Sequence, residues 1–517
     1  MSERKASSAQ PVLFFFVGLS FLALLVFALI LAAEGALDLL LHPLTWLGRL
    51  QPGAALDMLS NAAEVVAGVL AIAITVVAIV VELAANRYTH RITQLFVREP
   101  VNIAVMTLFV ITTIQCLWVG ATFGGELATG HSWTYAGLVI SMGLVTLCLL
   151  VLLPYFAFVF SFLSPPNVVT RLRDSALRAI ERADGPSLGR WRAEVMEAVD
   201  ELEDVARGAM THGDRGIGMA AIDALGGLVR RYASGKSALP AAWFIPSEDV
   251  ISKDPDFVSL ASSSLEVILE QHSWLEYKVL RQLHGLFIRA LGEARELCDR
   301  IALEVFRIGE TALRGSDQGA VVQVIRAFNS LLRAAVNADD LRSAYFILDQ
   351  YRSFAAVAQE VGQHETALAA ADHLVEYGQL GQEKGQSFLV EVVAYDLVRL
   401  VQQATEQAQE NVDALLARLL EVDEVAAQDG GSKLRGVRRA QVQLGVFFLA
   451  RGDAEHAQVI QRDMANESPD LLAGIHRELA LETRDQYWEF TDRGENFGYL
   501  RPEERALLDT FLASVGE

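Results

Sequence analysis

The chain has 517 residues, of which 52% are apolar, a mean hydropathy of +0.29 and a formal net charge of −21. A soluble protein this acidic normally has a negative mean hydropathy, so the apolar residues must be concentrated in one part of the chain. Residues 1–170 hold 6 Lys and Arg against 8 Asp and Glu, whereas residues 171–517 hold 37 against 56. These numbers exclude a small secreted domain, a basic nucleic-acid-binding protein and a simple one-domain enzyme. They predict a membrane region joined to a large acidic soluble region.

Four stretches are long and apolar enough to cross a membrane, which requires about 20 residues in a helix. Helices are expected because backbone groups find no water in the hydrocarbon layer. The four spans are predicted at about residues 11–33, 61–84, 101–123 and 135–163, within a membrane domain of residues 1–166. The first span is too long for the apolar core of a cleaved signal peptide, so we interpret it as an anchor.

Positive charges in the short loops predict the orientation of these spans. Basic residues precede the first span, lie between the second and third, and follow the fourth, whereas Arg49 is the one cation in the other two loops. Cytoplasmic loops carry the excess of Lys and Arg. Both termini are therefore expected in the cytoplasm, with the spans in a bacterial inner membrane.

Small and polar residues follow one face of the second span. They recur at steps of three and four, which places them in one line on a helix. They are Glu64, Gly68, Ala71, Thr75, Ala78, Glu82 and Asn86. Two interpretations remain open. The line could be a close packing face, or an oligomer could place it around a water path with rings of Glu favouring cations.

A basic loop connects the second and third spans, and a continuing helix with a tight turn at Pro100 is expected there. Its cations should hold the hairpin at the cytoplasmic surface and contact anionic lipid, and a specific site for a phosphate or lipid head group is the alternative. The residues concerned are Arg87, His90, Arg91 and Arg98.

The end of the second span and this loop carry a run of small and polar residues, then an aromatic-hydroxyl-His-Arg group, and later Phe, Val, Arg and an acid. The residues are Ala84, Ala85, Asn86, Tyr88, Thr89, His90, Arg91, Phe96, Val97, Arg98 and Glu99. The run resembles a bacterial family of predicted membrane proteins, domain of unknown function 2254, although that family favours Pro at His90 and Asp at Glu99. The resemblance covers about residues 60–165. It implies a membrane topology and no particular chemistry.

The remaining two thirds of the chain are predicted to be helical, because Ala, Leu, Glu, Arg and Gln dominate and no sustained alternation of apolar and polar residues occurs. The fold class is therefore all-α, a four-helix membrane region followed by a cytoplasmic α-helical repeat domain of solenoid type. We expect a membrane-proximal helical unit at 167–239, a loop at 240–262, a repeat array at 263–485 and an aromatic C-terminal cap at 486–517.

One segment reproduces the spacing of a tetratricopeptide repeat. Its defining positions are Leu444, Gly445, Phe448, Gly452, Ala457 and Pro469, together with Met464. A weaker second copy uses Tyr351, Phe354, Gly362, Ala367, Ala371 and Leu374. These positions favour a tetratricopeptide-type array, and an irregular α-solenoid of another type is the alternative.

No pattern of catalytic or metal-binding residues emerges. The histidines lack the His-x-x-x-His spacing, the three cysteines are isolated, and no glycine-rich phosphate loop follows a strand. We therefore expect neither an enzyme nor a cofactor. The leading hypothesis is a multi-pass scaffold or signalling adaptor whose array binds a protein partner. The partner could be another copy of the chain, and the acidic composition argues against nucleic acid. The alternative is an oligomeric cation channel that is lined by the second span and gated by the array.

Overall fold

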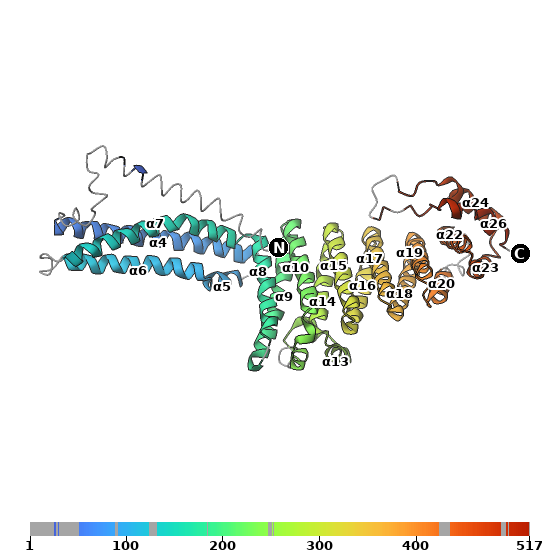
Figure 1. The fold of residues 1–517 in the computed structure, drawn as a ribbon, viewed down its shortest axis with the longest axis horizontal. Coiled ribbons are helices and arrows are strands. Elements are labelled where there is room, and N and C mark those ends of the chain that lie inside the picture. Colours follow the sequence, from blue (N-terminus) through green and yellow to red (C-terminus); the bar gives the residue numbers. More distant parts are fainter. Residues whose placement is uncertain are drawn as a thin grey trace. The chain divides into compact units, whose positions relative to one another are not determined.

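The computed structural model describes residues 25–26, 29, 51–87, 91–123, 132–183, 185–246, 251, 253–422, 435–487, 493–494 and 496–515. Every helix or strand assigned within these ranges is a helix, which confirms the all-α class (Figure 1). The chain divides into two compact units, Met1–Val168 and Val169–Glu517. Each unit is described separately below.

The first unit packs three long helices side by side. They are α4 (Pro52–Arg87), α6 (Pro100–Phe123) and α7 (Ser132–Phe162), with the short α5 (Arg91–Val97) between the first two. Small and apolar residues form the contact, including Ala55, Leu59 and Ala63 of α4 with Cys116 and Leu138. Such residues let helix backbones approach closely where no hydrophobic effect drives them together.

The outward faces of these helices are covered with large apolar side chains. Ile72 is 67% exposed and Trp118 is 72% exposed. Contiguous apolar surface of this kind is unfavourable in water and is the expected surface toward lipid. The helices Gly53–Ala85, Pro100–Phe123 and Ala136–Phe162 satisfy the length and hydropathy of membrane spans and coincide with three of the predicted ones. The span predicted at 11–33 lies almost wholly outside the described residues.

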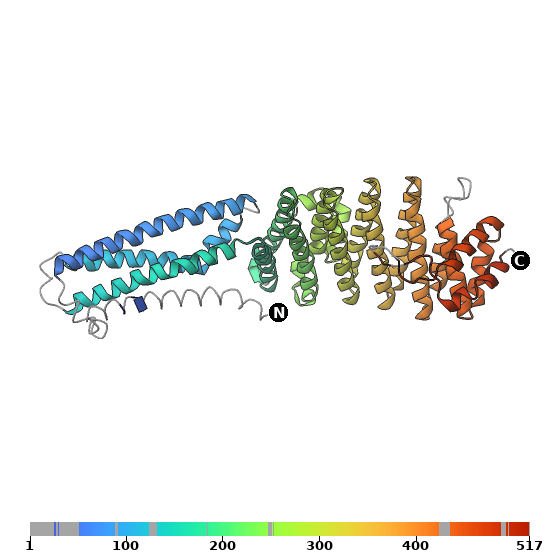
Figure 2. The same cartoon turned by 90° about the horizontal axis from the view of Figure 1, so that it is seen from above.

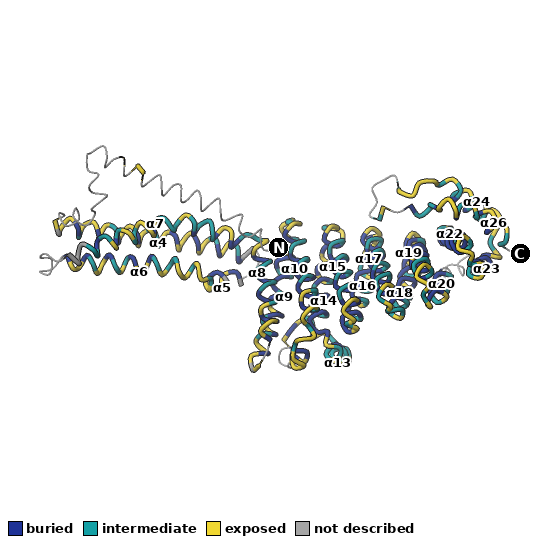
Figure 3. Tube along the Cα trace, in the orientation of Figure 1, coloured by how far each residue is buried: buried dark blue, intermediate teal, exposed yellow. Residues whose placement is uncertain are grey.

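A fourth helix in the described ranges, α16 (Gln318–Asn337), is also long and apolar enough to span a membrane. It differs from the other three because 61% of its apolar window is buried inside the protein, against 17–22% for them. Its apolar side chains therefore pack against neighbouring helices of the second unit. Figure 3 shows this contrast in burial along the chain.

The second unit stacks helices in two layers (Figures 1 and 2). Layer A contains α9 (Leu188–Thr211), α14 (Trp274–Ala290), α16, α18 (His364–Glu383) and α20 (Val412–Glu421). Layer B contains α10 (Arg215–Ala233), α15 (Arg295–Arg314), α17 (Leu341–Glu360), α19 (Ser387–Glu406) and α22 (Arg435–Ala450). The unit begins in α8 (Pro165–Glu181) and ends with α23 (Ala454–Asp463), α24 (Pro469–Leu481), α25 (Pro502–Arg505) and α26 (Leu508–Ala513).

The central helices follow a regular period. Helices α16 to α19 begin at residues 318, 341, 364 and 387, which is one helix every 23 residues and one helix pair every 46. A tetratricopeptide pair repeats every 34 residues or so, and HEAT or armadillo units repeat at about 40–47. The tetratricopeptide assignment of the copy at Tyr351–Leu374 is therefore not confirmed, and its helices are longer than that repeat allows.

A recurrent turn sets this period. Two positions after the last residue of each of the helices α15 to α18 comes a residue with positive φ, and these residues are Ser316, Asp339, Gly362 and Gly385. The next backbone N–H bonds back to a carbonyl of the last helical turn, as from Asp340 to Ala335 at 3.0 Å. The side chain of Asp340 then accepts from the N–H of Ser343 at 3.1 Å and caps the following helix. One short turn thus ends one helix and starts the next.

The described residues between α10 and α14 are held by buried contacts. They include η3 (Lys236–Ala238), η4 (Ala241–Phe244), α12 (Pro255–Val258) and α13 (Ser262–Glu270). Trp243 is fully buried against Trp274, and Lys278 donates to Asp254 at 2.7 Å and lies 2.7 Å from Asp200 of α9. Helices α9 and α10 pack directly on α14 and α15. The membrane-proximal helices and the array therefore form one continuous stack.

The positive φ in these turns predicts opposite changes in stability for two substitutions. Gly362 has φ +77° and Ala408, at the equivalent place after α19, has φ 51°. Because only glycine adopts this conformation without strain, Gly362→Ala should destabilise the local helices by about 1 kcal/mol and Ala408→Gly should stabilise them by a similar amount. Hydrogen exchange of the flanking helices measures both changes. Gly285→Ala, in the middle of α14 with open space around it, is the control and should stabilise. Equal effects of the two turn substitutions would contradict the prediction.

Candidate functional site

The predicted polar line of α4 lies on its exposed side. Glu64, Gly68, Ala71, Thr75, Ala78 and Glu82 are all exposed, whereas Val66, Ala73, Val77 and Val81 form the face that packs within the unit. The side chain of Asn86 lies outside the described residues. The line is therefore not the packing face toward α6 and α7, and it remains available to lipid, another part of the protein or another copy.

The basic loop is divided between two helices. Helix α4 is described as far as Arg87 and α5 from Arg91, so the continuing helix predicted here falls partly on residues 88–90, which lie outside the described residues. Pro100 is the first residue of α6. His90 and the side chains of Arg87 and Arg91 lie outside the described residues. Arg98 is exposed, and the neighbouring Phe96 is buried edge-on against Phe162. Arg98 is therefore the one cation of this loop whose side chain the structure describes.

The residues that defined the tetratricopeptide-like segment lie at helix contacts and turns near the end of the array. Leu444, Phe448 and Ala457 are fully buried, and Gly452 supplies the turn with φ +77°. A side chain at Gly445 would collide with the ring of Phe511 of α26. Pro469 is the first residue of α24, behind the capping residue Ser468. These residues hold the end of the array together and line no binding site.

A candidate site that none of the motifs singled out in the sequence indicated lies on layer A. A groove of about 800 Å³ crosses α14, α16 and α18. Its floor is apolar and includes Leu280, Ile288, Ala327 and Ala334. We call it the layer A groove. Its volume is within the range of about 300–1,000 Å³ that is typical of ligand sites.

The layer A groove is basic in a chain of net charge −21. Arg281 of α14 and Arg326 and Arg333 of α16 line it and are exposed. None of them forms an ion pair with a carboxylate in the described part of the chain. By contrast, Arg300, Arg307 and Arg314 of α15 all pair with Asp or Glu. Three neighbouring arginines without counter-charges are unusual on an acidic surface and favour the binding of an anion.

Aromatic and imidazole groups complete the rim. The guanidinium of Arg333 lies 5.8 Å from the centre of the Tyr377 ring, and the hydroxyl of Tyr377 donates to the carbonyl of Asn329 at 2.7 Å. Burial and the charge of Arg281 lower the pKa of His284, so this ring is neutral at pH 7. Glu376 is the one acidic lining residue, and it contacts His373 at 3.0 Å. The positive charge of the groove at neutral pH therefore comes from its arginines.

Two of the groove's arginines could have been grouped from the sequence, but adding the third requires knowing which helices are neighbours in the array. Arg326 and Arg333 are seven residues apart and so lie on one face of a helix. Arg281 joins them because α14 and α16 are neighbours in layer A. Within the described ranges, no group of three or more His, Cys, Asp or Glu is arranged to hold a metal ion.

Another titratable contact lies at the end of the array. His456 of α23 contacts Asp453 at 2.6 Å and Asp413 of α20 at 2.8 Å. Burial is the largest single influence and lowers its pKa, but the two carboxylates together outweigh burial, so the pKa is raised. A protonated His456 therefore ties α23 to α20.

The raised pKa of His456 gives a pH dependence with a definite sign. The stabilisation is complete below the ordinary pKa of about 6.5 and is lost as the pH rises through the raised value. We expect the α20 and α23 amides of the wild type to be several-fold better protected from hydrogen exchange than those of His456→Gln at pH 5.5, after correction for intrinsic rates. The difference should shrink at pH 9. His476→Gln, at an exposed histidine paired with Asp509 of α26, is the control for α20. A difference between the proteins that grows with pH would overturn the assignment.

Comparison with known proteins supports the membrane assignment. Residues 9–223 match the family model "Predicted membrane protein (DUF2254)", which confirms the family resemblance and extends it beyond residues 60–165 into α9 and α10. No curated protein matches the sequence. A solved structure that is described as "Circular tandem repeat protein with novel repeat topology and enhanced subunit contact surfaces" is similar, with 14% identity and a TM-score of 0.35 over 83% of this chain and 97% of the other.

Proposed function

We propose that this is a multi-pass protein of the bacterial inner membrane whose repeat array lies in the cytoplasm and binds an acidic segment of a protein partner in the layer A groove. The three unpaired arginines of this groove are the observation that carries the proposal. The protein would act as a scaffold or signalling adaptor, without catalysis or a cofactor. The positive charges that flank the predicted spans support the orientation.

Charge supports an acidic partner at this place. The array as a whole is strongly negative and repels acidic molecules, so an acidic segment would be attracted only where the local potential is reversed. Arg281 of α14 and Arg326 and Arg333, which are two turns apart on α16, provide such a reversal. Arginine is suited to this role because its planar group pairs with a carboxylate through two hydrogen bonds. The basic groove would repel the basic segments that the acidic remainder of the array attracts, so it would select acidic segments.

The shape of the groove supports a helical segment. Stacked helices expose an extended surface that suits peptides better than compact small molecules. The apolar floor, with Leu280 and Ile288 of α14 and Ala327 and Ala334 of α16, is bordered by the arginines. An amphipathic helix with apolar residues on one face and Glu or Asp beside them would match this pattern. The resulting contact would have an apolar centre and a charged rim, as in other protein interfaces.

A peptide-binding measurement tests this proposal. The probe is a fluorescent 14-residue helix-forming peptide with Leu on one face and four Glu beside it, added to the full-length protein in nanodiscs. We expect Arg326→Glu with Arg333→Glu to weaken binding at least about tenfold, because two attractive contacts become repulsive. Wild-type binding should also weaken as NaCl rises from 50 to 200 mM.

The matched control is Arg462→Glu on α23, which reverses an exposed arginine that also lacks a carboxylate partner among the described residues. It should bind the probe as the wild type does. A peptide of the same composition with its Leu and Glu scrambled should bind neither protein well. If the double variant and the control lose affinity equally, the groove is not the binding site.

A second candidate function rests on the polar line of α4. Its exposure, with Glu64 and Glu82 separated by 18 residues or about 27 Å along the helix, is what a pore-lining face in an oligomer requires. The protein would then be a cation channel that the array gates. This candidate needs several copies of the chain, whereas the scaffold does not.

Reconstitution in planar bilayers distinguishes the two functions. A channel should give currents that favour K⁺ over Cl⁻, and Glu82→Gln should reduce that preference because it removes a ring of charge. Glu181→Gln, on α8, is the control and should leave the selectivity unchanged. If purified protein gives no current at any voltage, or if its selectivity is the same in both variants, the second span does not line a pore.

A further inference from the structure

The C-terminal part of the chain returns along layer B. We call residues 485–487, 493–494 and 496–500 the C-terminal strap. After α24 the strap reaches α17 and α19, where Arg493 contacts residues 148 and 97 positions earlier in the sequence, and it contacts α22 before α25 begins. The described residues of the strap contain turns and bends but no helix. Its contacts with the array are concentrated at two places.

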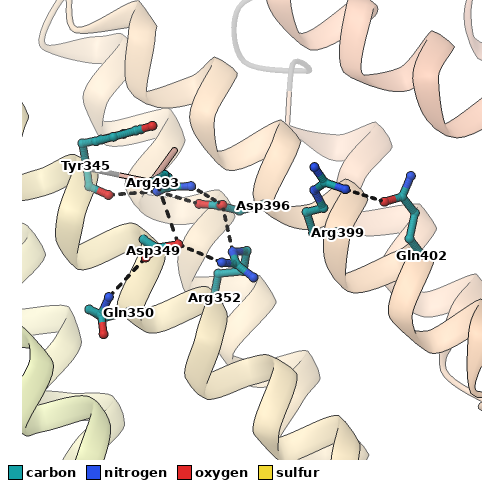
Figure 4. A network of polar contacts seen from close by, with 8 residues as sticks. All are labelled: Tyr345, Asp349, Gln350, Arg352, Asp396, Arg399, Gln402 and Arg493. Carbon is teal, nitrogen blue, oxygen red and sulfur yellow. Dashed lines mark hydrogen bonds and ion pairs between the residues drawn. The ribbon is translucent and has the colours of Figure 1, made fainter. Parts of the chain in front are cut away.

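The first contact is a buried ion pair (Figure 4). Nη1 of Arg493 lies 2.5 Å from Oδ1 of Asp396, and Nη2 donates to the carbonyl of Tyr345 at 2.8 Å. Only 2% of each charged side chain is exposed. The guanidinium also lies 4.3 Å from the centre of the Tyr345 ring, which favours a cation there. The pocket thus recognises arginine through a carboxylate, a carbonyl and an aromatic face.

Apart from Arg493, the charged groups of the pocket come from the array. Asp349 and Asp396 come from α17 and α19, and Arg352 contacts both, at 2.8 Å from Asp349 and 3.4 Å from Asp396. Without Arg493, two carboxylates would share one guanidinium. Burial raises the pKa of Asp396, and Arg493 and Arg352 oppose that effect. A second cation is therefore needed to neutralise the two carboxylates of the pocket.

The second contact lies four residues further on. The ring of Phe497 stacks on Tyr395 of α19, with the ring centres 4.4 Å apart and the planes within 6° of parallel. Gln443 of α22 donates to the carbonyls of Phe497 at 2.7 Å and Tyr499 at 3.3 Å. These bonds recognise backbone and would accept any extended segment with an aromatic side chain at this place.

The strap fits its surface incompletely. A cavity of about 240 Å³ lies between it and the array, lined by Tyr395 and Gln402 on one side and Asn496 and Tyr499 on the other. Nε of Arg493 is buried but donates no hydrogen bond to a described residue, and it lies 3.9 Å from Asp349. A buried charge with an unsatisfied donor is costly. The strap is therefore anchored at two sites without being close-packed between them.

We propose that the face of α17, α19 and α22 is a second binding surface, which recognises an extended segment with an arginine followed four residues later by an aromatic ring, and that the strap occupies it in cis. A partner segment with the same two features would displace the strap. The surface is selective for basic segments, in contrast to the layer A groove. This proposal does not depend on the function proposed for that groove.

A competition experiment tests the proposal. The probe is a fluorescent peptide of residues 493–500, Arg-Gly-Glu-Asn-Phe-Gly-Tyr-Leu, added to full-length protein in nanodiscs. The tethered strap competes at a local concentration on the order of millimolar, so wild-type protein should bind the probe weakly. Arg493→Ala should bind it at least about tenfold more tightly, because more of the surface is then free. Adding Asp396→Asn should remove that gain, and so should Ala in place of the first residue of the probe.

Controls separate release of the strap from loss of structure. Arg484→Ala changes an exposed arginine that pairs locally with Glu482, and it should bind the probe as weakly as the wild type. If Arg493→Ala fails to fold because Asp396 loses its partner, Phe497→Ala decides instead, since it releases the second contact and leaves no buried charge unpaired. Probe binding that does not increase in the folded variant overturns the proposal. The layer A variants Arg326→Glu and Arg333→Glu should leave this binding unchanged, so the two proposals can fail separately.

Discussion

The turn between successive helices is the constraint on which the array depends. A residue with positive φ lies two positions after the end of one helix, and the next residue occupies the N-cap position of the following helix. The helices α16 to α19 therefore have the same length, and each begins 23 residues after the last. This regularity keeps alternate helices in the same layer. Corresponding positions of the helices in one layer therefore lie on the same surface of the array. The basic groove of layer A and the acidic pocket of layer B are both consequences of that register.

Charge is distributed unevenly between the two layers. In layer A, Arg281, Arg326 and Arg333 line a groove and have no carboxylate partner in the described part of the chain. In layer B, Asp349 and Asp396 form a pocket that requires a cation from elsewhere in the chain. The net charge of −21 hides both features, because it is a sum over residues that lie on different surfaces. Two opposite local potentials on one array would let a scaffold hold segments of different chemistry at the same time.

The membrane region was predictable because transfer into lipid depends on the sum of contributions from consecutive residues. The spans at 61–84, 101–123 and 135–163 were located closely for this reason, although α4 begins earlier, at Pro52. The same sum misleads at α16, which is as apolar as a span and is covered by neighbouring helices. The polar line of α4 was found by its spacing, but which side of the helix packs was decided by contacts with α6 and α7.

The sequence by itself determined the all-α class and the positions of three described spans, because each depends on neighbours along the chain. It did not determine the period of the array, because the turns that set the period are not marked by glycine alone. Ser316, Asp339 and Ala408 adopt the positive φ that a sequence pattern normally assigns to glycine. Only the tertiary structure brought Arg281 beside Arg326 and placed Arg493 on Asp396, 97 residues away. The physical reason is that contacts between distant residues depend on the accumulated geometry of every turn between them, which no local pattern records.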